Sequence, residues 1–134
     1  MKRTPADAFA PVRAVGSTLP GVEASTRYDG APVLKAGGSF VAALATHRSA
    51  EPGTLVVRMD VDEREWLIAD APQTYYLTDY YRSYPLVLAR LSQLDRDALR
   101  DLLSVSLRLA LEKTSKRGRR QPPLDDLDEE LSHG

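Results

Sequence analysis

The stretch APVLKAGGSFVAALA, residues 31–45, decides the fold of this chain. Two extended and largely apolar runs, residues 33–36 and 39–45, flank the pair Gly37-Gly38. Both glycines can take a positive φ at little steric cost, as a two-residue hairpin turn requires. The stretch therefore predicts two antiparallel strands joined by a tight turn. The alternative, a phosphate-binding loop, needs its glycines before a helix, and these stand between two strands.

Strands and helices continue on both sides of this hairpin. Three more strands are predicted over residues 54–60, 74–77 and 86–91. Three helices are expected, near residues 9–18, from a cap at Asp62 or Asp60 to Pro72, and from a cap at Asp95 to Lys113. The last helix carries the clearest apolar stripe in the chain.

The order of these elements, α-β-β-β-α-β-β-α, indicates the fold class. Consecutive strands joined by short turns favour an antiparallel sheet. Helices at its ends and in its middle favour two layers. The sequence thus predicts an α+β fold, with a two-layer arrangement of helices on an antiparallel sheet of about five strands.

Composition limits the class of protein further. The chain has 134 residues, of which 43% are hydrophobic and 28% charged, as in a soluble globular domain. We expect one domain over residues 1–112. The absence of cysteine excludes disulfides and zinc–thiolate sites and fits a reducing compartment. Neither a secretory signal nor a run of about 20 apolar residues is found, so we expect a cytoplasmic protein with no membrane partner.

Residues 113–134 are expected to form a charged mobile tail. Five basic residues between Lys113 and Arg120 precede five acidic residues between Asp125 and Glu130. The net charge of −1 gives no global attraction to nucleic acid. Because the acidic block can screen the basic one, a solvated tail is preferred to a nucleic-acid-binding arm.

The sequence contains no motif for catalysis or metal binding. The carboxylates of residues 60–65 do not match a calcium loop and are expected at a helix N-terminus. His47 lies in a polar loop with no G-x-S-x-G partner, and we interpret it as a solvated residue. We therefore expect a non-enzymatic protein with no catalytic residue, no metal and no cofactor.

Strand alternation suggests a basic surface on the sheet. Lys35, Arg58 and Arg90 lie in three different strands with apolar neighbours. A two-layer fold leaves one sheet face less covered, and we hypothesise that the three side chains converge there. Such a face could hold a phosphate backbone or a partner's carboxylates. The alternative is that each side chain reaches water or pairs with a local carboxylate.

Five of the chain's six tyrosines fall in one stretch, TYYLTDYYRSYP. Tyr75 and Tyr76 are adjacent in a predicted strand and so point to opposite faces. Tyr80, Tyr81 and Tyr84 are expected in the loop before the last strand. They could stack on nucleic-acid bases, or they could reflect the ordinary preference of tyrosine for sheets.

Four stretches in consistent order resemble the YjbR/MmcQ-like family. They are LPGVEAST from Leu19, GAPVLKAGGSF from Gly30, LVVRMDVDEREWL from Leu55 and TDYYRSYPLVLARL from Thr78. The resemblance extends over about residues 10–112. It implies a compact α+β fold and a predicted DNA-binding function.

The resemblance also implies site residues. Lys35, Arg58 and Arg90 match positions where the family often has Lys or Arg, and Tyr81 and Tyr84 match its Y-x-x-Y-P-like loop. The sequence departs from the family at Thr-Asp-Tyr-Tyr, residues 78–81, in place of T-P-H-Y, and at Pro-Leu, residues 85–86, in place of P-W. The missing histidine and tryptophan reduce the capacity of the loop to stack on a ligand.

The sequence therefore predicts a DNA-binding protein that uses a basic sheet face. The candidate nucleic-acid or anion contacts are Lys35, Arg58, Arg90, Tyr81, Arg82 and Tyr84. The alternative is an interaction module whose tyrosine-rich loop binds a small ligand, a protein partner or a second copy of the chain in a homodimer. Affinity that falls steeply with salt would favour DNA.

Overall fold

The structure is a computed structural model, and it describes residues 5–28 and 30–115. Its elements in chain order are α1 (Pro5–Gly16), β1 (Val22–Thr26), β2 (Pro32–Ala36), β3 (Ser39–Leu44), β4 (Thr54–Arg58), α2 (Val61–Asp70), β5 (Tyr75–Tyr76), α3 (Asp79–Arg82), β6 (Leu86–Arg90), the 3-10 turn η1 (Leu91–Gln93) and α4 (Arg96–Ser115). The predicted α+β class is confirmed.

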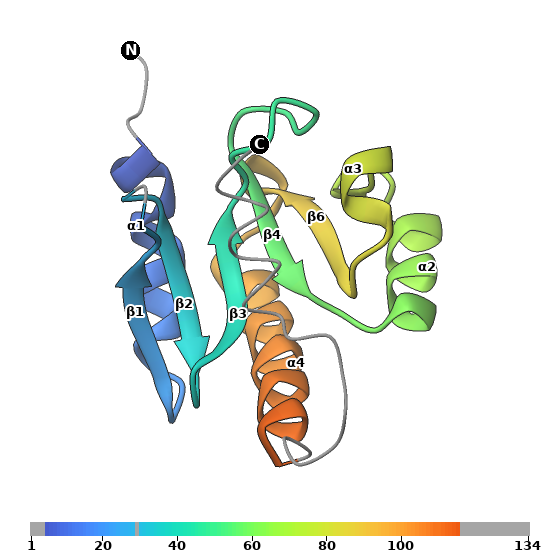
Figure 1. The fold of residues 1–134 in the computed structure, drawn as a ribbon. Coiled ribbons are helices and arrows are strands. Elements are labelled where there is room, and N and C mark those ends of the chain that lie inside the picture. The colour runs from blue at the N-terminus through green and yellow to red at the C-terminus, as the bar shows by residue number, and fades with distance from the viewer. Residues whose placement is uncertain (1–4, 29, 116–134) are drawn as a thin grey trace.

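The strands form one six-stranded sheet in the order β1-β2-β3-β4-β6-β5 (Figure 1). Every neighbouring pair is antiparallel. The first four strands follow one another as a meander. The chain then makes α2, β5 and α3 before β6 returns to pair with β4, which leaves β5 at the edge.

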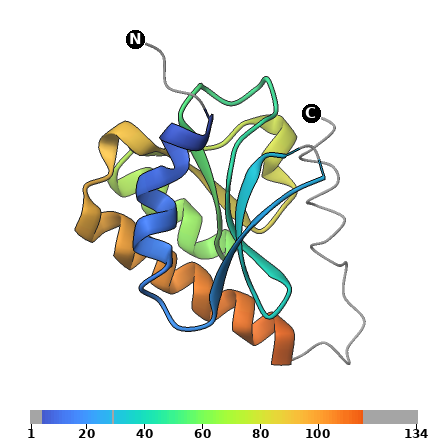
Figure 2. The same ribbon diagram turned by 90° about the vertical axis from the view of Figure 1, so that its left-hand side faces the viewer.

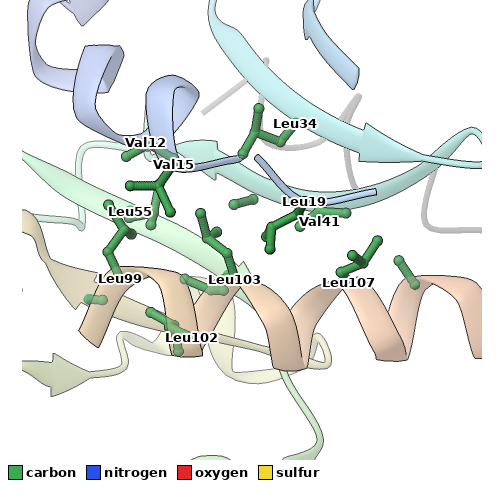
Figure 3. Packing of buried hydrophobic residues seen from close by; sticks show 14 of the residues in the cluster. Val12, Val15, Leu19, Leu34, Val41, Leu55, Leu99, Leu102, Leu103 and Leu107 are labelled. Carbon is green, nitrogen blue, oxygen red and sulfur yellow. The ribbon is translucent and has the colours of Figure 1, made fainter. Parts of the chain in front are cut away.

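Two helices cover one face of the sheet. α1 and α4 lie on the same side of the strands, behind them in Figure 1; in Figure 2, α1 lies to their left and α4 runs from their left to below them. We call this side the helix-covered face, and the other side the second face. The main core fills the space under α1 and α4 (Figure 3); its central members include Val12, Leu34, Val41, Leu55, Leu99 and Leu103.

The hairpin at residues 31–45 forms as predicted. Gly37 and Gly38 have φ values of 57° and 79°, the left-handed conformation that a tight two-residue turn requires. An irregularity in the β2–β3 register lies between Leu34 and Lys35. As a result, Lys35 stands opposite Phe40, a residue of the second face.

α4 also forms for the predicted reason. The backbone N–H of Ala98 donates to Oδ1 of Asp95 at 2.8 Å, so Asp95 is the N-terminal cap. Leu99, Leu102 and Leu103 are buried at helical spacing. The helix continues to Ser115, past the predicted domain boundary at residue 112. The charged tail predicted beyond it lies, from residue 116 on, outside the described residues.

Three local predictions were wrong. β1 at residues 22–26 was not predicted, because its residues are mostly exposed at the sheet edge and lack an apolar face. The predicted loop at residues 79–82 is the short helix α3. α1 begins at Pro5 rather than near residue 9. Of the two caps considered for α2, the structure has Asp60, although Asp60 makes no side-chain capping bond. No helix within residues 5–28 and 30–115 is long and apolar enough to cross a membrane.

Candidate anion-binding face of the sheet

The basic residues of the strands all lie on the second face. The strands contain only three, Lys35, Arg58 and Arg90. Arg58 is two residues from Val56 in β4, and Arg90 is two residues from Leu88 in β6, so each arginine shares a face with that neighbour. Val56 and Leu88 belong to the buried apolar cluster of the second face, which we call the second-face cluster. Lys35 faces the same way because it is paired with Phe40. The prediction that these three residues share one face of the sheet is therefore confirmed.

The three side chains do not converge, however. Lys35 and Arg58 both border Phe40, since Lys35 is its register partner and Arg58 Nε donates to its carbonyl oxygen at 2.6 Å. Arg90 is at the other end of the same strands. In the β4–β6 ladder it stands opposite Thr54, whereas Arg58 stands opposite Leu86. The hypothesis of one basic cluster is therefore wrong for Arg90.

Arg58 is largely removed from solvent. It is 5% exposed, and its guanidinium lies 5.8 Å from the centre of the Phe40 ring. The Ser106 hydroxyl donates to the Arg58 carbonyl oxygen at 2.7 Å, which fastens α4 to the end of β4. Arg58 therefore packs in the sheet, and little of it can meet a macromolecule.

Arg90 is held in an ion pair with Glu51. Its Nε and Nη2 donate to the two carboxylate oxygens at 2.9 and 2.7 Å. Nη1 donates to the carbonyl oxygens of Pro72 and Gln73, and the guanidinium lies 4.2 Å from the centre of the Tyr76 ring. The hydrogen bond raises the pKa of Arg90 and lowers that of Glu51. Local pairing, the alternative considered from the sequence, is what the structure shows.

Tyr81 is in the second-face core rather than on a loop surface. It is fully buried beside Leu86, and its hydroxyl accepts the backbone N–H of His47 at 3.3 Å. Burial raises the pKa of this phenol to about 12. A buried ring cannot stack on a base, so its assignment as a contact residue is not supported.

The other two candidates of this segment are more accessible. Arg82 is exposed, and its Nε lies 3.8 Å from a carboxylate oxygen of Asp79. Tyr84 is half-buried beside the second-face cluster. Tyr75 and Tyr76 divide between the two faces as predicted, because Tyr75 packs on the main core and Tyr76 on the second-face cluster.

His47 is not the solvated residue that the sequence indicated. Its ring stacks on Tyr80 with centroids 3.5 Å apart and planes 9° from parallel. Its Nδ1 accepts the backbone N–H of Ser49 at 3.0 Å, and the Ser49 hydroxyl bonds to that of Thr78 at 2.8 Å. These contacts fix the loop after β3 against α3, and no sequence pattern connects the two segments.

Two buried arginines were not singled out from the sequence. Arg64 of α2 is 4% exposed and donates to the carbonyl oxygens of Arg82, Tyr84 and Leu86. Burial lowers its pKa. Arg27, directly after β1, is 6% exposed, and its Nη2 donates to the Leu44 carbonyl oxygen at 2.9 Å. In the sequence, only strand alternation from Ser25 could place Arg27 on the second face. That argument requires residues 22–26 to be predicted as a strand, and they were not.

Within the described part of the chain, no group of three or more histidine, aspartate or glutamate side chains is placed to hold a metal ion. The basic residues of the strands bring guanidinium and ammonium groups to the second face, and Tyr76, Tyr80 and Tyr84 pack against its cluster. Groups of this kind bind anions and aromatic rings.

The comparisons with known proteins bear on the fold. No family model matches the chain, and no curated protein matches it. Among solved structures, the crystal structure of Deinococcus radiodurans protein DR2400, with the family-model domain DUF419, matches with a TM-score of 0.64 and 22% sequence identity. The match covers 94% of this chain and 91% of that chain. The chain shares its fold with a DUF419 protein. DUF419 is the family often called YjbR/MmcQ-like, and at this identity the likeness establishes the fold alone.

Proposed function

We propose that this protein is a non-enzymatic DNA-binding protein of the DUF419, or YjbR/MmcQ-like, type, acting in the cytoplasm through its second face. The observation that carries the proposal is the charge asymmetry of the sheet. Lys35, Arg58 and Arg90 all face the same side, and Arg27 extends the set beyond β1. The only carboxylate in the strands, Glu23, is the register partner of Lys35 and so lies on the same face, where it offsets part of the positive charge.

A face of this kind suits a phosphate backbone. Phosphate contacts from Lys and Arg need no particular base sequence, and they release condensed counterions from the duplex. In our proposal Lys35, which is half-buried, and Arg82, which is exposed, make such contacts. Arg58 adds to the potential of the face while its side chain stays in its hydrogen bond to Phe40, whereas the charge of Arg90 is balanced by Glu51.

The test is binding of a fluorescently labelled DNA duplex to the full chain, followed by anisotropy at several salt concentrations. The test variant is Lys35→Gln with Arg82→Gln. The matched control is Arg96→Gln with Arg100→Gln, which removes the same charge from exposed positions on α4, on the helix-covered side.

We expect measurable affinity for the DNA duplex at low salt, and this affinity should fall steeply as the salt concentration rises. Loss of two phosphate contacts should make the slope of log affinity against log salt shallower by about 1.8. The control pair should leave the slope unchanged. Absence of binding at low salt, or an equal effect of both pairs, would contradict the proposal.

A second candidate function is favoured by one observation. The stacked His47–Tyr80 pair is half-buried and held by the Ser49 and Thr78 hydroxyl groups, so it offers a rigid aromatic surface. Rigid aromatic groups are common anchors in protein interfaces. Self-association or ligand binding that is insensitive to salt and lost in Tyr80→Ala would favour this interaction module.

A further inference from the structure

A groove lies between α2 and α4, on the helix-covered side of the sheet. It has a volume of about 280 Å³ and is open to solvent. Its apolar lining consists of residues that belong to the main core or pack against it, so the groove is an opening in the surface of that core. These residues are Met59, Leu67, Tyr75, Leu102 and Val105.

Carboxylates from both helices stand beside this apolar lining. Glu63 of α2 and Asp101 of α4 line the same groove, and both are exposed. None of the ion pairs among the described residues includes either of them. Arg64, next to Glu63 in sequence, is buried and donates to three carbonyl oxygens. Arg108, further along α4, pairs with Glu112. The groove therefore combines an apolar lining with two carboxylates that have no basic partner in the described part of the chain.

Trp66 adds to this surface on α2. It is the chain's only tryptophan, and 74% of it is exposed. Helical spacing places it next to Glu63, three residues before it, and Asp70, four residues after it. An exposed indole beside an apolar groove, with carboxylates around both, is typical of a surface that another molecule covers.

We propose that the groove between α2 and α4 is the docking site for a basic segment of a partner protein. The aliphatic part of one arginine or lysine of the partner lies on the apolar lining, and its cationic end binds Glu63 and Asp101. Trp66 packs against the neighbouring residues of the same segment, as tryptophan often does at the centre of protein interfaces. This site does not compete with DNA for the second face, because carboxylates repel a phosphate backbone.

The size of the groove favours a protein segment over a small organic cation. Its volume of about 280 Å³ lies below the range of about 300–1,000 Å³ that is typical of small-molecule sites, and such sites enclose most of their ligand. This groove is open and suits a single long side chain. A small amine bound there would leave Trp66 uncovered, whereas a segment that continues past the groove covers it.

The single tryptophan makes the fluorescence of the full chain a direct measure of binding. The probe is the peptide acetyl-Ala-Leu-Arg-Leu-Ala-amide, and a matched peptide carries citrulline, an uncharged analogue, in place of arginine. The arginine peptide should change the emission of Trp66 and saturate with a Kd of about 1 mM or lower. The citrulline peptide should bind about tenfold more weakly, because it forms no ion pair with the carboxylates.

Substitution of the carboxylates tests the residues assigned to the site. Glu63→Gln with Asp101→Asn should weaken binding of the arginine peptide about tenfold and leave that of the citrulline peptide unchanged. The control, Glu23→Gln with Glu65→Gln, removes the same charge from exposed positions outside the groove and should have no effect. Because all four positions are exposed, both variants should fold. Trp66→Ala, measured by titration calorimetry, should also weaken the arginine peptide about tenfold.

Failure of the arginine peptide to bind at about 5 mM would overturn the docking site, as would equal weakening by both variant pairs. Three results would overturn the assignment to a partner protein. Binding of acetylarginine amide as tight as that of the peptide would identify a small organic cation as the ligand. A dimer that dissociates in the variant of Glu63 and Asp101 would identify a second copy of the chain. The chain's own basic block is the occupant if the peptide binds only after glutamine replaces its members beyond α4, which are Lys116, Arg117, Arg119 and Arg120.

Discussion

Replacement of Arg64 by alanine should destabilise the protein by about 3 kcal/mol. Arg64 makes three hydrogen bonds to carbonyl oxygens, at 2.6 Å to Tyr84, 2.8 Å to Arg82 and 3.1 Å to Leu86. A bond from a charged donor contributes about 1.5 kcal/mol or more, so three of them give roughly 4–5 kcal/mol. Burial of the guanidinium, which lowers its pKa, offsets part of this gain. For a chain of this size the loss corresponds to a fall in melting temperature of roughly 8–15 °C.

Urea denaturation followed by circular dichroism measures this loss. Arg64→Lys should recover less than half of it, since an ammonium group cannot reach three carbonyl oxygens in the same geometry. The control is Arg100→Ala, an exposed arginine of α4, which should change stability by less than about 0.5 kcal/mol. If Arg64→Ala costs less than about 1 kcal/mol, then Arg64 does not hold α3 and β6 together and the reasoning fails.

Two further predictions concern the second face and the hairpin. The Tyr81 phenol has a pKa of about 12 against an ordinary 10.0, so the native state prefers the protonated form; this stability is complete below pH 10 and is lost as pH rises from about 10 to about 12. Between these pH values the free energy of unfolding should therefore fall by roughly 2–3 kcal/mol. The fall should be absent in Tyr81→Phe and present in Tyr28→Phe, a control at a 70% exposed position; an equal effect of both substitutions would refute the assignment. At the turn, Gly38 has a φ of 79°, so Gly38→Ala should lower the free energy of unfolding by about 1 kcal/mol. Gly38→Asn should lower it by less, because asparagine tolerates this conformation, and equal losses in urea denaturation would contradict the turn geometry.

Local patterns were sufficient for much of the fold. The Gly37-Gly38 pair specifies its turn through backbone conformation alone. Asp95 and the stripe that includes Leu99 and Leu103 specify α4 through a cap and a buried face. The period of two along a strand gave the common face of Lys35, Arg58 and Arg90, because alternation does not depend on which strands are neighbours.

The remaining features depend on contacts between distant segments. α3 is only four residues long, and its C-terminal end is held by Arg64, which lies in a different helix. The partner of Arg90 is Glu51, 39 residues away in a loop, so the sequence alone could not show that this arginine is paired. Arg27 was missed for a related reason: β1 lies at the sheet edge and carries no apolar periodicity that would mark it as a strand.

The position of β6 between β4 and β5 has a consequence for folding during synthesis. β1 to β4 can pair with one another as soon as they are made, because they are neighbours both in sequence and in the sheet. β5 has no strand to pair with until residues 86–90 have been made. The apolar helix-covered face of the early sheet, moreover, stays partly open until α4, the last element, packs against β3 and β4. A nascent chain that stalls before α4 therefore presents an apolar sheet surface, which makes it a substrate for chaperones and prone to aggregation.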